Sequence, residues 1–474
     1  MVGIVSYGAY IPIYRLGREE IGRVWGTGGG KGEKAVANCD EDSLTMGVEA
    51  AVDCLQGIDR KSVDGLYFAS TTPPYREKQS ASIIRAVLDL NPDIITADFT
   101  DSLRAGTSAL RAAIDAVKAR SAEKVLVVTA DCRLPAPNSE FEAIFGDGAS
   151  AFLIGNSEVF LNIEGSYTTS SEFIDVWRRE NDPYPRTWED RFISTHGYLE
   201  IVEKATLTMM KKHHLSPKDF TKTIFPAPDA RSHSTMARRL GFDYQNQVRD
   251  PMFDKIGHTG AAFGLMMLAA AIEESKAGEK ILFSNYGDGC DCYIFQVANH
   301  IEKLTKRRGI RNNLSSKMHL SNYGKYLRFR NLIEWEPDRR PAEYSSLTTL
   351  WRDRKQILAL IGHKCKNCGK VQIDFPIQRV CSWCQSKDEF DEVRLSDKKG
   401  TLFSFSMDER TRDLDLPCVT AVVDIEEGAR LVTVMTDRDP QALQVGMPVE
   451  FTFRKLHEGQ GICNYFWKCR PVRV

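Results

Sequence analysis

GDGASAFLI, residues 146–154, joins a glycine-flanked acidic turn to a run of small and apolar residues that is typical of a buried strand. A second turn of this kind, GDG at residues 287–289, follows another strand-like run, KILFSNY at residues 280–286. The two turns stand 141 residues apart, each beside a strand. This repetition hints at an internal duplication, although the flanking sequences differ too much to prove it.

The first 300 residues alternate short strand-like runs with longer segments of helical period, which is the pattern of a layered α/β domain. KVLVVTA at residues 124–130 is a further buried-strand run, and residues 265–276 are apolar enough for a central helix. The opening MVGIVS lacks the basic segment of a signal peptide and predicts a first strand. We therefore predict one α/β domain over residues 1–302.

The chain of 474 residues is too long for one hydrophobic core, and its charges nearly balance, with 63 lysines and arginines against 64 aspartates and glutamates. Such a balance gives no overall field that would attract nucleic acid or an anionic membrane. No apolar run reaches the ~18 residues of a membrane span. The 12 cysteines fit a reducing compartment better than a disulfide framework. We expect a cytoplasmic protein without a nucleic-acid or membrane partner.

The last third of the chain changes character. A basic stretch, KLTKRRGIR at residues 303–311, predicts a linker, which we extend over residues 303–322. Residues 323–336 have the pattern of an amphipathic helix, and Pro337 and Pro341 are expected to end it. Strand-like runs then alternate with short turns, which predicts a small five-stranded β-barrel over residues 391–474. These runs lie at residues 402–407, 419–425, 431–435 and 449–453.

Four cysteines between this helix and the barrel give the most specific chemical signal in the chain. They are Cys365, Cys368, Cys381 and Cys384, in the spacing C-x2-C-x12-C-x2-C. Each pair can turn two thiolates towards one ion, so that two pairs complete a tetrahedral shell of four sulfur atoms, which suits Zn2+. Because all four positions are filled by protein, we predict a structural zinc ion. The helix and this zinc module together span residues 323–390.

Five short motifs occur in the order and context that archaeal-type 3-hydroxy-3-methylglutaryl-CoA synthases show, and residues 1–300 therefore resemble this branch of the thiolase superfamily. The motifs are DEDS (40–43), PPY (73–75), AGT (105–107), GDGASA (146–151) and YGDG (286–289). Residues 320–474 resemble the DUF35 module, which consists of a leading helix, a rubredoxin-like zinc ribbon and an OB-fold. The resemblance implies a thiolase-type αβαβα layered body, a coenzyme A thioester as substrate, and a homodimer or a heteromer with another thiolase-like chain.

Three positions depart from the synthase motifs. Leu103 stands two residues before AGT, where these synthases carry the cysteine that attacks the acyl thioester. Thr71 stands in place of the general-base glutamate, and Pro226 in place of the histidine of the Phe-His-Gln-Pro-Asn motif. Since leucine cannot be acylated, the resemblance implies no route through an acyl-enzyme. We expect Thr71 and Leu103 to lie in the substrate-binding pocket.

A glycine-rich motif, GHTGAAFG at residues 257–264, resembles the Gly-His-Pro motif of true thiolases, whose histidine lies in the catalytic pocket. His258 is thus a candidate general acid or base near neutral pH, and a packed or capping histidine is the alternative. Tyr286, Asp288 and Cys290 follow a strand end that lines the same pocket in the superfamily. We expect the first two to be catalytic and Cys290 to contact the substrate; the alternative is a tight turn with simple burial.

These residues support two main hypotheses. In the first, the chain is an enzyme that makes or breaks a carbon–carbon bond in a coenzyme A thioester without a covalent acyl-enzyme, most simply by retro-aldol cleavage of a β-hydroxyacyl-CoA. Thiolase-like proteins that lack the cysteine and pair with DUF35 modules include such aldolases. In the second, the chain is a non-catalytic scaffold that binds coenzyme A and pairs with an active thiolase-like chain. Nucleic-acid binding by the C-terminal module is a third possibility, which the charge balance and the acidic residues 388–392 disfavour.

Overall fold

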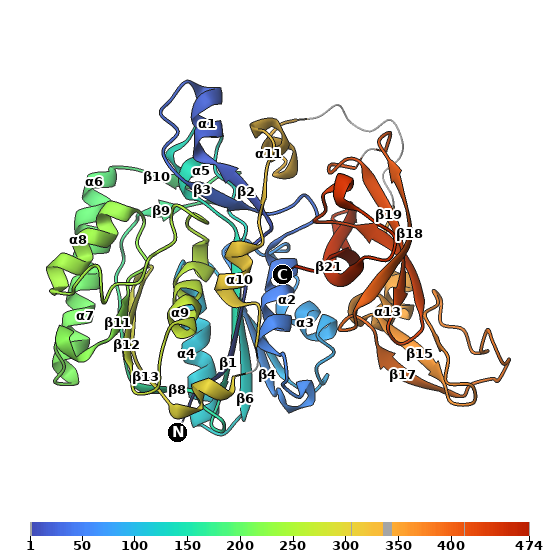
Figure 1. Cartoon of the computed structure of the whole chain (residues 1–474). Helices are drawn as coiled ribbons and strands as arrows, with labels where there is room; N and C mark the ends of the chain where they lie inside the picture. Colours follow the sequence, from blue (N-terminus) through green and yellow to red (C-terminus); the bar gives the residue numbers. More distant parts are fainter. Residues whose placement is uncertain (1, 305, 335–343, 412, 474) are drawn as a thin grey trace. The chain divides into compact units, whose positions relative to one another are not determined.

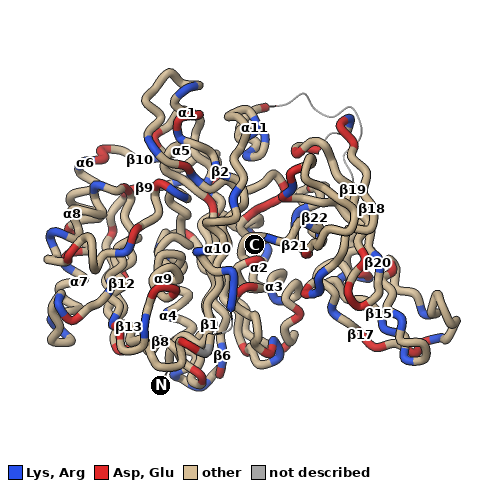
Figure 2. Tube along the Cα trace, in the orientation of Figure 1, with Lys and Arg blue, Asp and Glu red and all other residues tan. Residues whose placement is uncertain are grey.

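The computed structural model describes residues 2–304, 306–334, 344–411 and 413–473. The chain forms two compact units (Figure 1). The first comprises Met1–Ala37, Asp42–Arg85 and Leu90–Leu332, and the second comprises Asn38–Glu41, Ala86–Asp89 and Ile333–Val474. Within the described ranges, no helix combines the length and the apolar character that spanning a membrane requires. Basic and acidic residues are interspersed along the chain trace, in keeping with the balanced composition (Figure 2).

A nine-stranded sheet runs through the first unit. Its strand order is β11-β12-β13-β8-β1-β7-β6-β4-β5. The pairs β11/β12, β4/β6 and β4/β5 are parallel, and the other neighbours are antiparallel. The strands are β1 (Gly3–Tyr10), β4 (Gly65–Ala69), β5 (Ile95–Phe99), β6 (Lys124–Asp131), β7 (Gly148–Gly155), β8 (Leu161–Ser170), β11 (Lys222–Ile224), β12 (Lys280–Tyr286) and β13 (Gly289–Val297).

The sheet contains one strand order twice. In the first half the neighbours run β4-β6-β7-β1, and in the second half they run β11-β12-β13-β8, with the same parallel and antiparallel pairings. The two acidic turns precede β7 and β13, so they occupy corresponding positions. The halves meet where Gly3 and Ile4 of β1 pair with β8. A Cβ atom at Gly3 would fall 2.3 Å from the Leu161 carbonyl oxygen, so only glycine fits this junction. The topology supports the internal duplication that the repeated turn indicates.

Helices lie between the two halves of the sheet and on both outer faces, which confirms the αβαβα layers implied by the resemblance (Figure 1). The central pair is α4 (Ala105–Lys118) and α9 (Phe263–Glu273). Every residue of α9 from 263 to 272 is buried, because this helix is apolar on all sides. The outer helices are α2 (Ser43–Cys54) and α3 (Ser80–Val87) on the first half, and α7 (Glu200–Lys212) and α8 (Ala230–Leu240) on the second.

Shorter elements complete the first unit. They are β2 (Tyr14–Gly17), α1 (Arg18–Trp25), β3 (Glu33–Val36), α5 (Glu140–Ile144), β9 (Val176–Trp177), β10 (Arg186–Thr187), α6 (Asp190–Phe192), α10 (Gly309–Ser315), β14 (Met318–His319) and α11 (Tyr323–Phe329). Strand β2 pairs with both β3 and β14, which ties the end of this unit to its beginning.

The segment predicted as a basic linker, residues 303–322, is instead packed into the first unit, where it contributes α10 and β14. Arg307 donates a hydrogen bond to the Tyr7 carbonyl oxygen. The Asp53 carboxylate accepts the backbone N–H of Arg308 at 2.7 Å. These two basic residues of the segment thus bind partners within the first unit, which the local sequence alone does not show.

The helix predicted over residues 323–336 is shorter than expected. Helix α11 ends at Phe329, and Asn331 has a φ of 49°, a left-handed conformation through which an α-helix does not continue. Residues 335–336 and the two prolines expected to end the helix lie outside the described residues. Helix α11 belongs to the first unit, although we grouped it with the zinc module.

The second unit contains a small sheet of order β16-β15-β17 and a closed barrel of order β18-β19-β20-β22-β21. The four runs read from the sequence lie in β18 to β21, and β22 closes the barrel, which confirms the OB-fold prediction. Buried residues alternate with more exposed ones along β19, as expected for a strand with one face in the core. The elements are α12 (Leu347–Arg352), α13 (Arg354–Ala359), β15 (Ile361–Cys365), β16 (Val371–Gln372), β17 (Phe390–Arg394), β18 (Gly400–Asp408), β19 (Cys418–Ile425), β20 (Arg430–Met435), β21 (Pro448–Gly459) and β22 (Ile462–Pro471).

Candidate functional site

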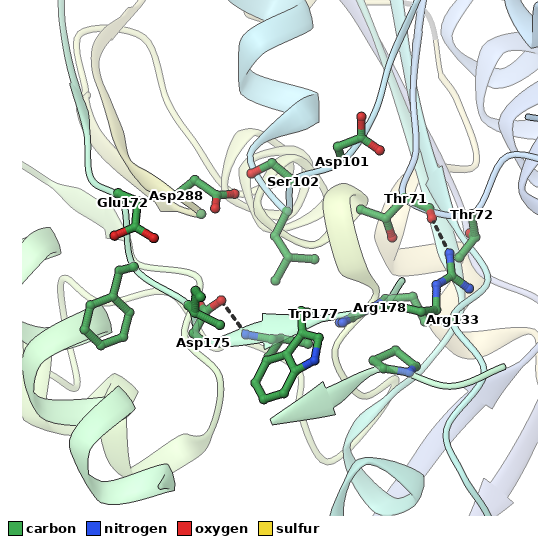
Figure 3. Close-up of a pocket in the computed structure, with 16 residues that line it drawn as sticks. Thr71, Thr72, Asp101, Ser102, Arg133, Glu172, Asp175, Trp177, Arg178 and Asp288 are labelled. Carbon is green, nitrogen blue, oxygen red and sulfur yellow. Dashed lines mark hydrogen bonds between the residues drawn. The ribbon is translucent and has the colours of Figure 1, made fainter. Parts of the chain in front are cut away.

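A cavity of about 390 Å3 lies at the ends of several strands of the first unit. Its wall consists of residues 71–72, 101–103, 133, 172–178, 185 and 287–288 (Figure 3). Three of these segments follow the carboxyl ends of β4, β6 and β12, and residues 101–103 precede the central helix α4. Open α/β sheets bind ligands outside the carboxyl ends of their strands. This cavity is therefore the candidate site of the first unit.

Asp131, the last residue of β6, fixes one side of the cavity. Its fully buried carboxylate accepts hydrogen bonds from the Thr71 N–H at 2.7 Å and the Thr71 hydroxyl at 2.9 Å. It also accepts from the hydroxyl groups of Ser70 and Thr72 and, at 2.7 Å, from the N–H of Ala261. One carboxylate with five donors thus ties the loop after β4 to the segment that leads into α9.

Thr71 and Leu103, both expected in the substrate-binding pocket, line the cavity. The Thr71 hydroxyl is committed to Asp131 and is therefore not free to act as an acid or base. Leu103 contributes an apolar side chain just before α4. None of the described residues that line the cavity is a cysteine.

His258 is not among the residues that line the cavity, although the charge of Arg133, which does, acts on it. The residue is 8% exposed, and its ring centroid lies 4.4 Å from that of Phe263. Burial, and after it the charge of Arg133, lowers the pKa of His258 to about 3. The ring nitrogen Nδ1 accepts a hydrogen bond from the Gly260 N–H at 3.2 Å. The imidazole is therefore neutral at neutral pH, with its proton on Nε2.

Tyr286, Asp175 and Asp288 form a polar group at another side of the cavity. The Tyr286 hydroxyl donates to the Asp175 carboxylate, and both aspartates line the cavity. Burial is the main cause that raises the pKa of Asp175 and of Tyr286. Asp288 is exposed and has a φ of 44°, a left-handed conformation that costs a non-glycine residue about 1–3 kcal/mol. Strained backbone of this kind clusters at functional sites.

Cys290, which we expected to contact the substrate, is not among the lining residues. It is fully buried, with its Sγ atom 3.8 Å from that of Cys292, and burial raises the pKa of its thiol well above the usual value. Of the residues expected in the site, Thr71, Leu103 and Asp288 line the cavity. Tyr286 and His258 lie close to residues of its wall, and Cys290 lies in the core of the second half.

The first acidic turn lies in a different environment. Asp147 is buried, and its carboxylate accepts the Ala37 N–H at 2.8 Å and the Arg330 guanidinium at 3.3 Å. The N–H of Gly146 donates to the His258 carbonyl oxygen at 3.1 Å. This turn therefore supports the backbone of His258 and does not line the cavity.

The four predicted metal ligands lie together in the second unit, with their sulfur atoms all within 4.8 Å of one another. The Sγ atoms of Cys365 and Cys384 are 3.6 Å apart, as are those of Cys368 and Cys381. Zn–S bonds of about 2.3 Å in a tetrahedron put the sulfur atoms about 3.8 Å apart, so this donor set fits Zn2+. Four cysteine ligands leave no open position, so a bound zinc ion would hold the module together without contacting a substrate.

Sequence reasoning missed several residues of the site, among them Asp131, Arg133 and Asp175. Asp131 and Arg133 follow the strand-like run at residues 124–130, and polar residues at a strand's carboxyl end are a signal for a binding site, so both could have been found. Asp175 lies in an irregular segment after β8 that neither periodicity nor a motif marks. Only the fold brings it to Tyr286.

Two family models match parts of the chain. Residues 210–297 match the C-terminal part of 3-oxoacyl-(acyl-carrier-protein) synthase III. Residues 392–454 match the C-terminal OB-fold domain of ChsH2. The first match covers most of the second half of the nine-stranded sheet and the second covers much of the barrel, so each agrees with the fold described above.

Curated relatives and solved structures match a large part of the chain. The hydroxymethylglutaryl-CoA synthase of Methanopyrus kandleri is 32% identical over 345 residues, which are 70% of this chain and 98% of that protein. That of Pyrococcus horikoshii is 34% identical over 341 residues, which are 70% and 94%. A solved HMG-CoA synthase complexed with CoA matches with a TM-score of 0.63 at 17% identity, over 73% of this chain and 94% of that one. 3-Oxoacyl-(acyl-carrier-protein) synthase III from Aquifex aeolicus matches with a TM-score of 0.56 at 21% identity, over 62% and 100%.

Proposed function

The chain belongs to the hydroxymethylglutaryl-CoA synthase family of the thiolase superfamily, and we propose that its first unit makes or breaks a carbon–carbon bond in a coenzyme A thioester by aldol chemistry, without a covalent acyl-enzyme. The names of the relatives support a coenzyme A thioester as the ligand. The observation that carries the proposal is Leu103, an apolar side chain that lines the cavity just before α4, where the motif of the family carries its nucleophilic cysteine.

Two cysteines, Cys132 and Cys290, stand within two residues of the wall residues Arg133 and Asp288 in the sequence. Both are poorly suited to replace that nucleophile. Cys290 is fully buried beside Cys292. Cys132 follows Asp131, and its Sγ atom lies 2.7 Å from a guanidinium nitrogen of Arg330. Burial raises the pKa of both thiols, so neither is a thiolate at neutral pH. These surroundings favour a route in which no thioester to the protein forms.

In the cleavage direction, a base takes the proton of the β-hydroxyl group of a β-hydroxyacyl-CoA. The Cα–Cβ bond then breaks, its electron pair forms the enolate of the shortened thioester, and Cβ leaves as an aldehyde or ketone. Protonation of the enolate carbon gives the shortened acyl-CoA. This sequence requires a positioned base and a hydrogen-bond donor to the thioester oxygen.

We assign the base to Asp175. Its carboxylate lines the cavity, and burial raises its pKa, which makes it a stronger proton acceptor than an ordinary aspartate. Tyr286 donates a hydrogen bond to this carboxylate and so orients it. Asp288, the exposed carboxylate of the same wall, is suited to pass the proton to solvent.

We assign His258, which does not line the cavity but lies close enough for the charge of Arg133 to act on it, to stabilise the enolate oxygen of a bound thioester. Because Nδ1 accepts the Gly260 N–H, the ring offers an Nε2–H donor, and a pKa of about 3 keeps the ring neutral throughout the working range of pH. A neutral imidazole that donates to a developing oxyanion stabilises it without releasing its own proton. This role replaces the general acid or base expected from the motif alone.

The alternative is a non-catalytic scaffold that binds coenzyme A and pairs with an active thiolase-like chain. One observation favours it: His258 does not line the cavity, as the histidine of a working site would be expected to do.

A panel of β-hydroxyacyl-CoA and β-ketoacyl-CoA thioesters, followed by mass spectrometry, tests the proposal. We expect a shortened acyl-CoA with its carbonyl product, and no added mass on the protein. Asp175→Asn should lower turnover by about 10²- to 10⁴-fold, the usual loss for a general base. Glu180→Gln, which removes an exposed carboxyl group outside the cavity, is the matched control.

Two outcomes would contradict the proposal. An acetyl group carried by the protein after incubation with labelled acetyl-CoA would overturn the non-covalent route. Turnover that occurs only after a thiolase-like partner is added would favour the scaffold instead.

A further inference from the structure

A second cavity, of about 410 Å3, lies in the first unit, and the proposed reaction gives it no role. Its wall consists of residues 7, 272, 273, 275, 301, 302, 304, 306–308, 311 and 312. None of the described residues lines both cavities. Helix α9 begins just after Ala261, which donates to Asp131 at the candidate site, and it ends at Glu273 in the wall of the second cavity. The two cavities therefore lie at opposite ends of α9.

Tyr7, within strand β1, brings an unpartnered hydroxyl group to the second cavity. The residue is 7% exposed, and its hydroxyl has no hydrogen bond with any residue in the described part of the chain. The charges of Glu273 and Arg311, two residues of the wall, act on this hydroxyl. Burial is the main cause that raises its pKa, so the phenol stays protonated and can donate. Because a buried hydroxyl without a partner is costly, this position suits a ligand that brings an acceptor.

Two basic side chains of the same wall have donors to offer. Lys306 and Arg311 are exposed, and their side chains have no hydrogen bond or ion pair with the described residues. Arg307 differs, because its guanidinium donates to the Tyr7 carbonyl oxygen and, at 2.6 Å, to the Ser6 hydroxyl. The ammonium and guanidinium groups of Lys306 and Arg311 are therefore available to an anion in the cavity.

The carboxylates near the cavity do not neutralise these two cations. The two oxygens of Glu273 accept the backbone N–H groups of residues 310 and 311. Asp53, which does not line the cavity but acts on Tyr7, accepts the backbone N–H groups of residues 308 and 309. The remaining acidic residue of the wall, Glu302, is exposed. Four basic residues line the cavity against two acidic ones, so its wall attracts an anion.

We propose that the second cavity binds a phosphate monoester, whose phosphoryl oxygens contact Arg311, Lys306 and the Tyr7 hydroxyl. Such an ester carries a charge of about −1.5 to −2 at pH 7 and has three strong acceptor oxygens, which match two cations and one phenol. The rest of the wall includes three apolar side chains, Ile272, Ile301 and Leu304. An ester with a small apolar group should therefore bind more tightly than inorganic phosphate. The inference goes beyond the proposed function and does not depend on it.

The test titrates phenyl phosphate into the full-length protein and measures binding by calorimetry. The wild type should show saturable binding. Arg311→Gln and Tyr7→Phe should each raise the Kd about 10-fold, the usual loss for one hydrogen bond to a charged group. Tyr7→Phe removes only a hydroxyl without a partner among the described residues, so the fold should be unaffected. Arg238→Gln is the matched control, because it removes an exposed charge on α8 outside both cavities, and it should keep the wild-type Kd.

Benzoate separates a phosphate site from a general anion site, because it keeps the ring and carries a carboxylate instead. It should bind at least ~10-fold more weakly than phenyl phosphate, since it has less charge and one acceptor oxygen fewer. Equal affinities would overturn the assignment to a phosphate. A wild type that does not bind phenyl phosphate would overturn the inference, as would a Kd that neither Arg311→Gln nor Tyr7→Phe changes. Thioester turnover tests the proposed function separately, so each can fail without the other.

Discussion

The two acidic turns of the first unit occupy corresponding positions and have opposite surroundings. Asp147, before β7, is buried and bonded to the Ala37 N–H and to Arg330, whereas Asp288, before β13, is exposed and lines the cavity. Both stand between two glycines. The repeated topology thus fixes where each turn lies, and the segments packed around it decide whether its aspartate stabilises the fold or faces a ligand.

The difference has a physical source in Arg330, which follows α11. A buried carboxylate requires a partner, and the guanidinium of Arg330 supplies it for Asp147. Asp288 keeps its contact with solvent, which stabilises its charge without a partner. One aspartate is therefore expected to contribute to the free energy of unfolding and the other to turnover.

We expect the first unit, which contains both turns, to fold without the zinc module. Replacement of a zinc ligand tests this and should have the largest effect of the variants proposed. Cys368→Ser should lower bound zinc from about one equivalent per chain to nearly none, because metal binding and folding of a small zinc module are coupled. Hydrogen exchange should rise in residues 361–394 and stay unchanged in the nine-stranded sheet. Cys418→Ser, in the barrel but outside the cluster, should keep its metal. Full metal content in Cys368→Ser would refute the assignment.

Separate replacement of Asp147 and of Asp288 tests directly whether the two turns differ in their contribution to stability. Asp147→Ala leaves the Arg330 guanidinium buried without its carboxylate, so the free energy of unfolding should fall by about 3–5 kcal/mol. Asp288→Asn, in the second turn, should change it by less than about 0.5 kcal/mol, since the side chain is exposed and asparagine also adopts the left-handed conformation readily. Chemical denaturation of both proteins gives the two values. Similar losses in the two variants would mean that the turns are equivalent after all.

Turnover should depend on His258, whose carbonyl oxygen is held by the first turn. His258→Ala should lower kcat by about 10²- to 10³-fold, the usual loss when one donor to an oxyanion is removed. His233→Ala is the control, because burial lowers the pKa of that histidine too, to about 4, and no residue of the cavity wall is among the groups whose charges act on it. A fully active His258→Ala protein in an assay that shows wild-type turnover would exclude the proposed role.

Replacement of Asp288, in the second turn, should lower turnover less than replacement of His258 does. Asp288→Asn should lower kcat by roughly 10-fold, because solvent can replace an exposed proton acceptor in part. The loss should not multiply with that of His258→Ala in the double variant, since groups that act on one transition state are coupled. Losses that multiply fully would indicate that the two residues serve separate steps.

The pH dependence of turnover distinguishes the carboxylates from the histidine. Burial raises the pKa of Asp175, so turnover should increase with pH through a midpoint above the ordinary aspartate value of about 3.9, as this base loses its proton. No second transition is expected near pH 6.5, because His258 is already neutral there. A transition near 6.5 that disappears in His258→Ala would show that the histidine titrates during the reaction.

The sequence predicts those parts of the fold that depend on local pattern. The run at residues 280–286 is β12 with the bounds expected, because a short continuous apolar run followed by a glycine turn specifies a buried strand and its end. The four cysteines converge because each pair sits in its own tight turn. The barrel could be predicted because four of its five strands appear in the sequence as strand-like runs.

Other parts depend on partners distant in the chain. The basic run at residues 303–311 has the pattern of a solvated linker, yet Arg307 reaches the Tyr7 carbonyl oxygen some 300 residues away. The same holds for the site. Thr71 and Leu103 could be anticipated because motifs mark their positions, whereas Asp175 meets Tyr286 only once β8 and β12 have their places in the sheet. Long-range pairing of this kind has no local signature.

The carboxylate of Asp131 has a consequence for redesign of the protein. It holds the strand-end wall by bonds to two segments far apart in sequence, so a library of substitutions at residues 70–72 would remove its hydroxyl donors and mostly yield proteins with a misassembled wall. Residues 172–174, 176 and 177, which line another part of the cavity, have no bond to that carboxylate and include only the two-residue strand β9. Directed evolution towards a different acyl group should therefore accept most of its changes at these positions, while the assigned base Asp175 is kept and Asp131 holds the strand-end wall constant.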